Sequence, residues 1–170
     1  MPSLADIKLI VFDVDGVLTD GGIYVDDRGI EMKRFHVRDG FAIRAAISLG
    51  MRIGVLTGRS TRAVTLRMAE LGVGLLIQGA HDKATALQTL CQQGGVLPEE
   101  VAYVGDDLID LPAMRRCGYP MAVADAVEDV LAAARYVTNC NGGHGAGREA
   151  IEHVLQAQGR WDEVVGRYGV

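Results

Sequence analysis

The sequence predicts an α/β protein in which helices cover both faces of a doubly wound, mostly parallel sheet. Short apolar runs alternate along the chain with segments of helical periodicity, and glycines or capping residues stand at many of the junctions. Such alternation is typical of parallel strands joined by helical crossovers. The chain has 170 residues, of which 49% are hydrophobic. This is enough for a substantial core, and we expect a single domain over 1–170.

The first third of the chain is expected to contain a strand, a hairpin and a helix. The first strand, 7–14, is a nearly continuous apolar run, which is typical of a strand buried on both faces. Turn-forming residues at 26–29 lie between two expected strand segments, 23–25 and 31–35, and predict a β-hairpin over 23–35. Apolar residues recur at helical spacing over 39–49, and Gly50 then ends the predicted helix.

The remaining elements repeat a strand followed by a helix. Pro112 falls where the first turn of a helix tolerates proline. Strands are expected at 52–56, 75–78, 101–104, 120–123 and 135–138. Helices are expected at 60–71 (with Ser60 or Thr61 as its cap), 83–93, 108–116, 127–134 and 148–158. The end of the chain shows no clear pattern, and we expect a C-terminal tail over 159–170 that is mobile or docks on a neighbouring molecule.

Composition excludes several classes of function. The net charge of −5 disfavours a general nucleic-acid binder, because phosphate backbones select basic surfaces. No apolar run approaches the length of a membrane-spanning helix, and the N-terminus lacks a signal-peptide profile. Cys91, Cys117 and Cys140 are widely spaced, so neither a disulfide framework nor a zinc site is expected. We therefore expect a cytoplasmic protein without nucleic-acid or membrane partners.

Polar and charged residues follow four of the predicted strands, near their carboxyl ends. In an open α/β sheet, ligands bind beyond these ends, so the side chains are expected to meet at one edge of the sheet. The residues concerned are Asp13, Asp15, Thr57, Gly58, Lys83, Asp106, Asp107 and Asp110.

This combination of side chains predicts phosphoryl transfer. Clustered carboxylates repel one another and need a counter-charge, which a hard cation such as Mg²⁺ supplies through oxygen ligands. The lysine and threonine would complement a phosphate dianion. One aspartate can attack phosphorus and form an aspartyl-phosphate. Its neighbour two positions on can protonate the leaving oxygen and then deprotonate water.

The motifs resemble those of a known superfamily of phosphohydrolases. The sequence DVDGVLT at 13–19, with the polar residues at 57–58, Lys83 and 105–107, is similar to the four motifs of the haloacid dehalogenase superfamily. The gaps between these motifs leave no room for a cap domain, so the chain resembles the capless branch. Further stretches resemble the 3-deoxy-D-manno-octulosonate 8-phosphate (Kdo 8-phosphate) phosphatase family. They lie at 35–40, 56–59, Gly79, 101–110, 122–126 and 142–149.

The resemblance implies a role for each motif residue. Asp13 would be the nucleophile and a ligand of Mg²⁺. Asp15 would be the acid/base residue, with its backbone carbonyl on the metal, and Asp106 would be the third ligand. The phosphate would be held by Thr57, Gly58 and Lys83, with Asp107 and Asp110 in support. Substrate contacts would come from Asp15, His36, Val37, Arg38, Asp39, Gly40, Arg44, Arg59, Arg67 and Lys83; position 36 is often asparagine in the family.

The resemblance also implies a substrate and an assembly. The substrate would be a small phosphorylated sugar acid, Kdo 8-phosphate, hydrolysed to Kdo and phosphate for lipopolysaccharide synthesis. The family is tetrameric, and hairpins and tails of neighbouring subunits help to close each site. We therefore expect a homotetramer with sites completed by its neighbours.

Three alternatives remain open. One is a phosphatase for a related nine-carbon sugar acid 9-phosphate, which would share the phosphate site. Another is a catalytically silent, tetramerising domain of the same fold, against which the intact motif aspartates argue. A phospho-receiver domain also gathers aspartates, a threonine and a lysine, but it lacks the D-x-D-G-x-x-T frame. The glycines at 142–147 do not match the G-x-G-x-x-G spacing of a dinucleotide loop, and we expect them to let backbone approach a neighbouring site.

Overall fold

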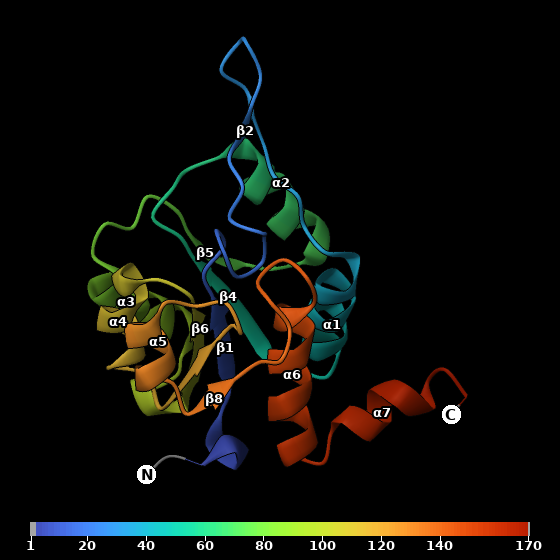
Figure 1. The fold of residues 1–170 in the computed structure, drawn as a ribbon. Helices are drawn as coiled ribbons and strands as arrows, with labels where there is room; N and C mark the ends of the chain where they lie inside the picture. The colour runs from blue at the N-terminus through green and yellow to red at the C-terminus, as the bar shows by residue number, and fades with distance from the viewer. Residues whose placement is uncertain (1–2, 170) are drawn as a thin grey trace.

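A computed structural model describes residues 3–169 and confirms the α/β fold class (Figure 1). Six strands form one parallel sheet in the order β5-β4-β1-β6-β7-β8, and two further strands form a separate antiparallel hairpin. The strands are β1 (Leu9–Phe12), β2 (Tyr24–Val25), β3 (Glu31–Met32), β4 (Arg52–Leu56), β5 (Leu75–Ile77), β6 (Val101–Gly105), β7 (Tyr119–Ala122) and β8 (Tyr136–Val137).

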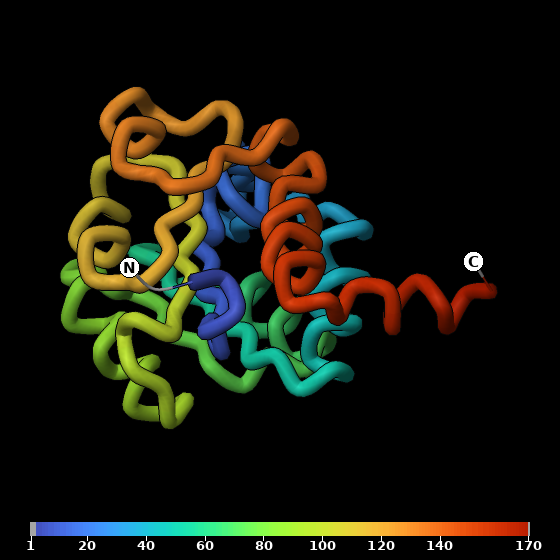
Figure 2. Tube along the Cα trace, turned by 90° about the horizontal axis from the view of Figure 1, so that it is seen from below, coloured from blue at the N-terminus to red at the C-terminus, as the bar shows by residue number. Residues whose placement is uncertain are grey.

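Helices cover both faces of the sheet. The first and sixth helices pack against each other on one face, and the third, fourth and fifth lie on the other (Figures 1 and 2). The helices are α1 (Val37–Ser48), α2 (Arg62–Leu71), α3 (Lys83–Gly94), α4 (Leu111–Met114), α5 (Glu128–Ala133), α6 (Ala146–Ala157) and α7 (Trp161–Gly166), with 3-10 turns η1 (Leu4–Asp6), η2 (Pro98–Glu100) and η3 (Leu108–Asp110). Among the helices within residues 3–169, none has both the length and the apolar character needed to cross a bilayer.

Strand β1 is the centre of the core. All four of its residues are buried, because β4 and β6 flank it in the sheet and helices cover it from both sides. The register aligns Phe12 at the end of β1 with Val55 of β4 and Val104 of β6. The segments that leave these three strands therefore start side by side at the same edge of the sheet.

The hairpin formed by β2 and β3 projects from this edge, as expected (Figure 1). A bridge between Thr19 and Phe35 closes its base. Only this hairpin and α1 separate β1 from β4, and only α2 and β5 separate β4 from α3. The expectation of a fold without a cap domain is confirmed.

Several helix boundaries differ from those expected. Helix α1 begins at Val37 rather than 39, because its first two residues, Val37 and Arg38, precede the apolar periodicity that starts at Phe41. Helix α6 begins at Ala146 rather than 148, and a Cβ added at its Gly147 would come within 3.1 Å of Leu18 and Asp39. The single helix expected over 108–116 is a 3-10 turn followed by the short helix α4, with Pro112 in the first turn of that helix. Strand β3 ends at Met32, three residues before the end of the expected segment 31–35, and the other elements differ from expectation by no more than two residues at either end.

The C-terminal tail, for which the sequence shows no clear pattern, contains a short helix in the structure. Residues Trp161–Gly166 form helix α7, which contacts α6 of the same chain. Trp161 and Val164 are 7% and 2% exposed and belong to the core. The Arg148 guanidinium lies 5.7 Å from the centroid of the Trp161 ring. The first half of the tail is therefore part of the folded domain.

Candidate active site

The carboxyl edge of the sheet brings together the motif residues, as the sequence predicts. Asp13 follows β1, Thr57 follows β4 and Asp106 follows β6. A cavity of about 150 Å³ opens at this edge. It is lined by Asp13, Asp15, Thr57, Gly58, Arg59, Asp106, Asp107 and Ile109.

Three carboxylates form an acidic cluster beside this cavity. One oxygen from each of Asp13, Asp106 and Asp110 lies within 4.8 Å of the other two. Burial, together with repulsion from Asp110, raises the pKa of Asp13 to about 7. Burial and the charge of Asp13 raise the pKa of Asp106 to about 8. Crowded carboxylates with raised pKa values indicate a site that lacks positive charge.

The cluster has an unused oxygen suited to a hard cation. Asp106 Oδ1 is buried and has no hydrogen-bond partner, and an unsatisfied buried carboxylate oxygen is unfavourable. A divalent cation with oxygen ligands would satisfy this atom and neutralise the repulsion between the carboxylates. The donor set therefore fits Mg²⁺, with Asp13 and Asp106 as side-chain ligands.

Lys83 is the buried cation that balances part of this charge. It is the first residue of α3, which Asp82 caps by accepting from the Ala84 and Thr85 N–H groups. Its ammonium lies 2.9 Å from Asp13 Oδ1 and 2.6 Å from Asp110 Oδ1. Burial lowers the pKa of Lys83, but the two carboxylates outweigh that effect and raise it. Lys83 therefore remains an ammonium between Asp13 and Asp110.

Asp110 is hydrogen-bonded to other residues of the cluster through both of its carboxylate oxygens. Its Oδ1 accepts a hydrogen bond of 2.7 Å from the Tyr103 hydroxyl, and its Oδ2 accepts from the Asp106 N–H at 3.0 Å. Sequence analysis missed Tyr103, whose side chain is fully buried in β6. Its position in an otherwise aliphatic strand could have indicated a polar contact, because a buried tyrosine hydroxyl usually finds a hydrogen-bond partner.

The loop after Asp15 packs closely against its surroundings. Gly16 has a φ of +88°, and its missing side chain leaves room for the Asp106 carboxylate. Gly142 packs against the Gly16 carbonyl, and the Gly143 N–H donates to the Val17 carbonyl at 2.9 Å. The glycines at 142–147 were expected to approach a neighbouring site; the backbone that they approach is the Asp15 loop of their own chain.

The stem of the hairpin lies over the Asp15 side of the cavity. Lys33, just after β3, forms an ion pair with Asp15 and a second one of 2.9 Å with Glu31. Glu31 pairs in turn with Arg59 at 2.7 Å. Hydrogen bonds from Lys33 and Arg59 hold the pKa of Glu31 below its usual value. Sequence analysis missed Glu31 and Lys33. Their spacing was the available signal, because side chains two residues apart in an extended segment lie on the same face.

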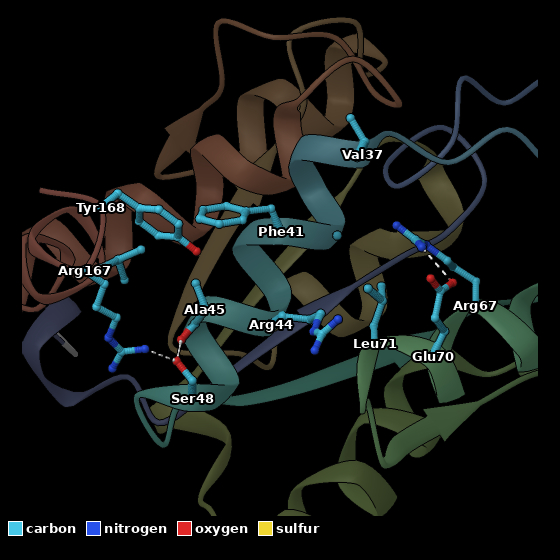
Figure 3. Close-up of a pocket in the computed structure, with 12 residues that line it drawn as sticks. Val37, Phe41, Arg44, Ala45, Ser48, Arg67, Glu70, Leu71, Arg167 and Tyr168 are labelled. Carbon is cyan, nitrogen blue, oxygen red and sulfur yellow. Dashed lines mark hydrogen bonds and ion pairs between the residues drawn. The ribbon is translucent and has the colours of Figure 1, made fainter.

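The residues expected to contact the sugar of the substrate do not all line the same cavity of this chain. Arg59 lines the cavity of the acidic cluster. Val37, Gly40, Arg44 and Arg67 instead line a separate cavity of about 440 Å³ between α1, α2 and the end of the chain (Figure 3). There Arg67 pairs with Glu70 at 2.8 Å, as Figure 3 shows. Tyr168 and Arg167 enclose the opposite end, where Arg167 donates to Ser48.

The other expected sugar residues have different surroundings. Asp39 is 2% exposed and accepts a 2.8 Å hydrogen bond from the Arg148 N–H at the start of α6. Burial raises the pKa of Asp39, and the Arg148 N–H opposes this shift. His36 lies beside Asp39 and Arg67 in a small internal space, and Arg38 lines an open cavity with His144. Asp39 therefore stabilises the start of α6 within this chain.

Comparisons with known proteins agree with this geometry. The profile of the haloacid dehalogenase-like hydrolase family matches residues 75–149. The 3-deoxy-D-manno-octulosonate 8-phosphate phosphatase KdsC of Salmonella typhi is 45% identical over 167 residues, which are 98% of this chain and 89% of that protein. The KdsC of Haemophilus influenzae is 45% identical over 157 residues, 92% of this chain and 87% of that protein.

Solved structures extend the likeness to three dimensions. The 3-deoxy-D-manno-octulosonate 8-phosphate phosphatase of Moraxella catarrhalis, in complex with a magnesium ion, a phosphate ion and a KDO molecule, has a TM-score of 0.94 and 40% identity, with 97% of this chain and 95% of that chain covered. The cobalt-bound form of the Haemophilus influenzae enzyme has a TM-score of 0.89 and 45% identity, covering 92% and 91% of the two chains. The chain belongs to the 3-deoxy-D-manno-octulosonate 8-phosphate phosphatase family of haloacid dehalogenase-like hydrolases.

Proposed function

We propose that this protein hydrolyses Kdo 8-phosphate to Kdo and phosphate, as a step of lipopolysaccharide synthesis. The observation that carries the proposal is the cluster of Asp13, Asp106 and Lys83 beside Asp15, in a chain about 45% identical to phosphatases of that substrate. The motif residues of a single chain lie together at one edge of the sheet, which supports the proposal.

The reaction would proceed in two steps. A carboxylate oxygen of Asp13 attacks phosphorus, the bond to the sugar oxygen breaks, and Asp15 gives its proton to that oxygen. Water then attacks the aspartyl-phosphate and returns a proton to Asp15, which releases phosphate and restores Asp13. Thr57, Gly58 and Lys83 would hold the phosphate oxygens throughout.

We propose Mg²⁺ as the cofactor, held by the Asp13 and Asp106 carboxylates and the Asp15 backbone carbonyl. The orphaned Asp106 Oδ1 and the raised pKa values of Asp13 and Asp106 support this assignment. When bound, the ion neutralises charge on the transferring phosphoryl group. Asp107 and Asp110 would support the ligands from behind, since Asp110 accepts the Asp106 N–H.

We further propose a cytoplasmic homotetramer. The hairpin exposes a group of apolar side chains that a neighbouring subunit would cover, namely Ile23, Tyr24, Val25, Ile30 and Met32. Arg44 and Arg67 lie in a cavity apart from the acidic cluster, which is the arrangement expected if neighbours complete each sugar site. Cys91, Cys117 and Cys140 are free thiols, as is usual in a reducing compartment.

Phosphate release from a small panel tests the proposal. Wild-type protein would be assayed with Mg²⁺ and with EDTA on Kdo 8-phosphate, a nine-carbon sugar acid 9-phosphate, hexose phosphates and p-nitrophenyl phosphate. We expect metal-dependent turnover with the highest kcat/KM on Kdo 8-phosphate, and none from the Asp13→Asn control. A preference for the nine-carbon substrate would replace the sugar assignment. No release from any ester would support the silent, tetramerising domain.

A further inference from the structure

The hairpin stem places a buried lysine on the proposed acid/base residue. The Lys33 side chain is 1% exposed. A lysine is almost never fully buried without partners, and here the partners are the carboxylates of Asp15 and Glu31. The Lys33 ammonium therefore connects the hairpin to the reactive edge of the sheet.

The contact with Asp15 is selective for one oxygen. Lys33 Nζ donates to Asp15 Oδ1. Within residues 3–169, Lys33 supplies the only side-chain ion pair of Asp15. The Asp15 side chain is 24% exposed, and Asp15 lines the cavity together with Asp13 and Thr57. Holding Oδ1 leaves Oδ2 available for proton transfer and fixes its direction.

A second ion pair anchors Lys33 itself. Glu31 contacts Lys33 at 2.9 Å and Arg59 at 2.7 Å. Arg59 comes from the segment after β4, directly beyond Thr57 and Gly58. The four alternating charges therefore run from the Asp15 loop to the phosphate-binding loop, with the hairpin stem between them.

We propose that Lys33 is a positioning residue that holds the Asp15 carboxyl in the orientation for protonating the leaving oxygen, with Glu31 as its anchor. The inference rests on the proposed two-step phosphatase reaction. In that reaction, the bond between phosphorus and the leaving oxygen breaks while the proton of Asp15 moves to that oxygen. A loosely held Asp15 would deliver this proton less effectively, because general-acid catalysis depends on geometry.

Three phosphate esters separate this role from the alternatives. The sugar of Kdo 8-phosphate and the glycerol of glycerol 3-phosphate leave as alkoxides that need the proton, whereas the p-nitrophenolate of p-nitrophenyl phosphate leaves without it. We expect Lys33→Met to lower kcat/KM about 10- to 100-fold on both alkyl esters, a part of the ~10²- to 10⁴-fold that a general acid supplies. On p-nitrophenyl phosphate the loss should be a few-fold. Lys33→Arg, which keeps the cation, should restore most of the activity.

Lys8→Met is the matched control for the side-chain change. Lys8 lies at the opposite end of β1, is 57% exposed and pairs with Glu100, so its loss should leave all three kcat/KM values unchanged. Should Lys33→Met fail to fold by circular dichroism, Glu31→Gln provides the test. It retains Lys33 but removes its anchor, and we expect the same dependence on the leaving group with a smaller loss.

The outcomes are distinct from one another. Equal losses on all three esters would assign Lys33 a merely structural role. A loss confined to Kdo 8-phosphate would make it a sugar contact, and no loss on any ester would remove it from the reaction; each of these overturns the proposal. Failure of the proposed substrate would appear separately, as an inactive wild type on Kdo 8-phosphate, while the two other esters still test Lys33.

Discussion

Replacing Gly16 by alanine tests how closely the Asp15 loop packs against the proposed metal ligand Asp106. At Gly16, φ is +88°, and a Cβ would lie 2.0 Å from Asp106 Oδ2 and 2.7 Å from Asp106 Cγ. A Cβ essentially never comes closer than 3.0 Å to a non-bonded heavy atom of a residue elsewhere in the chain. The carboxylate or the loop must therefore retreat by about 1 Å.

The expected effects follow from this displacement. Alanine at a positive φ costs ~1–2 kcal/mol of stability, which urea unfolding measures. A 1 Å misplacement in a catalytic site can lower turnover ~100-fold, so we expect a fall of that order in kcat/KM at low Mg²⁺. Raising the Mg²⁺ concentration should recover part of the loss, because a displaced ligand weakens metal binding first.

Gly72→Ala is the control for backbone strain. Gly72 ends α2 with a φ of +79°, and an added Cβ there would have no heavy atom within 4 Å. We expect the same loss of stability with unchanged kcat/KM and Mg²⁺ dependence. Wild-type kinetics in Gly16→Ala would contradict the close packing of Gly16 on Asp106, and equal kinetic losses in both variants would assign the effect to backbone strain.

Three further predictions follow from the site and the tail. Asp13→Asn and Asp15→Asn should each abolish steady-state phosphate release while circular dichroism stays unchanged; near-normal rates in either would refute its role. Burial and carboxylate repulsion raise the pKa of Asp13 to about 7 and that of Asp106 to about 8, so in EDTA the folded protein binds protons that the unfolded chain releases. Its free energy of unfolding should therefore fall as the pH rises from about 4 to 8, and thermal unfolding should show a shallower fall in Asp106→Asn. Ending the chain after Gly159 removes the buried Trp161 and should lower stability by ~3 kcal/mol or more; an unchanged urea midpoint would contradict its packing.

Local patterns were sufficient to predict the sheet and the convergence of the motif residues at one of its edges. The apolar run of β1 is buried on both faces, and the polar residues after β1, β4 and β6 converge because the strands are parallel neighbours. The position of Lys83 at the start of α3 follows from the same alternation. These features depend on residues close together in the sequence.

Contacts between distant segments could not be predicted in this way. The ion pair of Lys33 with Asp15 depends on how the hairpin folds back over the edge of the sheet. Helix α7 has too few residues to show periodicity, and its stability comes from packing Trp161 and Val164 into the core. The separation of Arg44 and Arg67 from the acidic cluster depends on the relative placement of α1 and α2.

Trapping the covalent intermediate on Asp13 would test the central claim most directly. Asp15→Asn protein would be mixed with p-nitrophenyl phosphate, whose leaving group needs no proton, and the mixture quenched, reduced with borohydride and mapped by mass spectrometry. We predict a burst of one nitrophenolate per site and conversion of residue 13 to homoserine. A burst without modification at position 13, or modification at Asp106 or Asp110 instead, would contradict the assignment of Asp13 as the nucleophile.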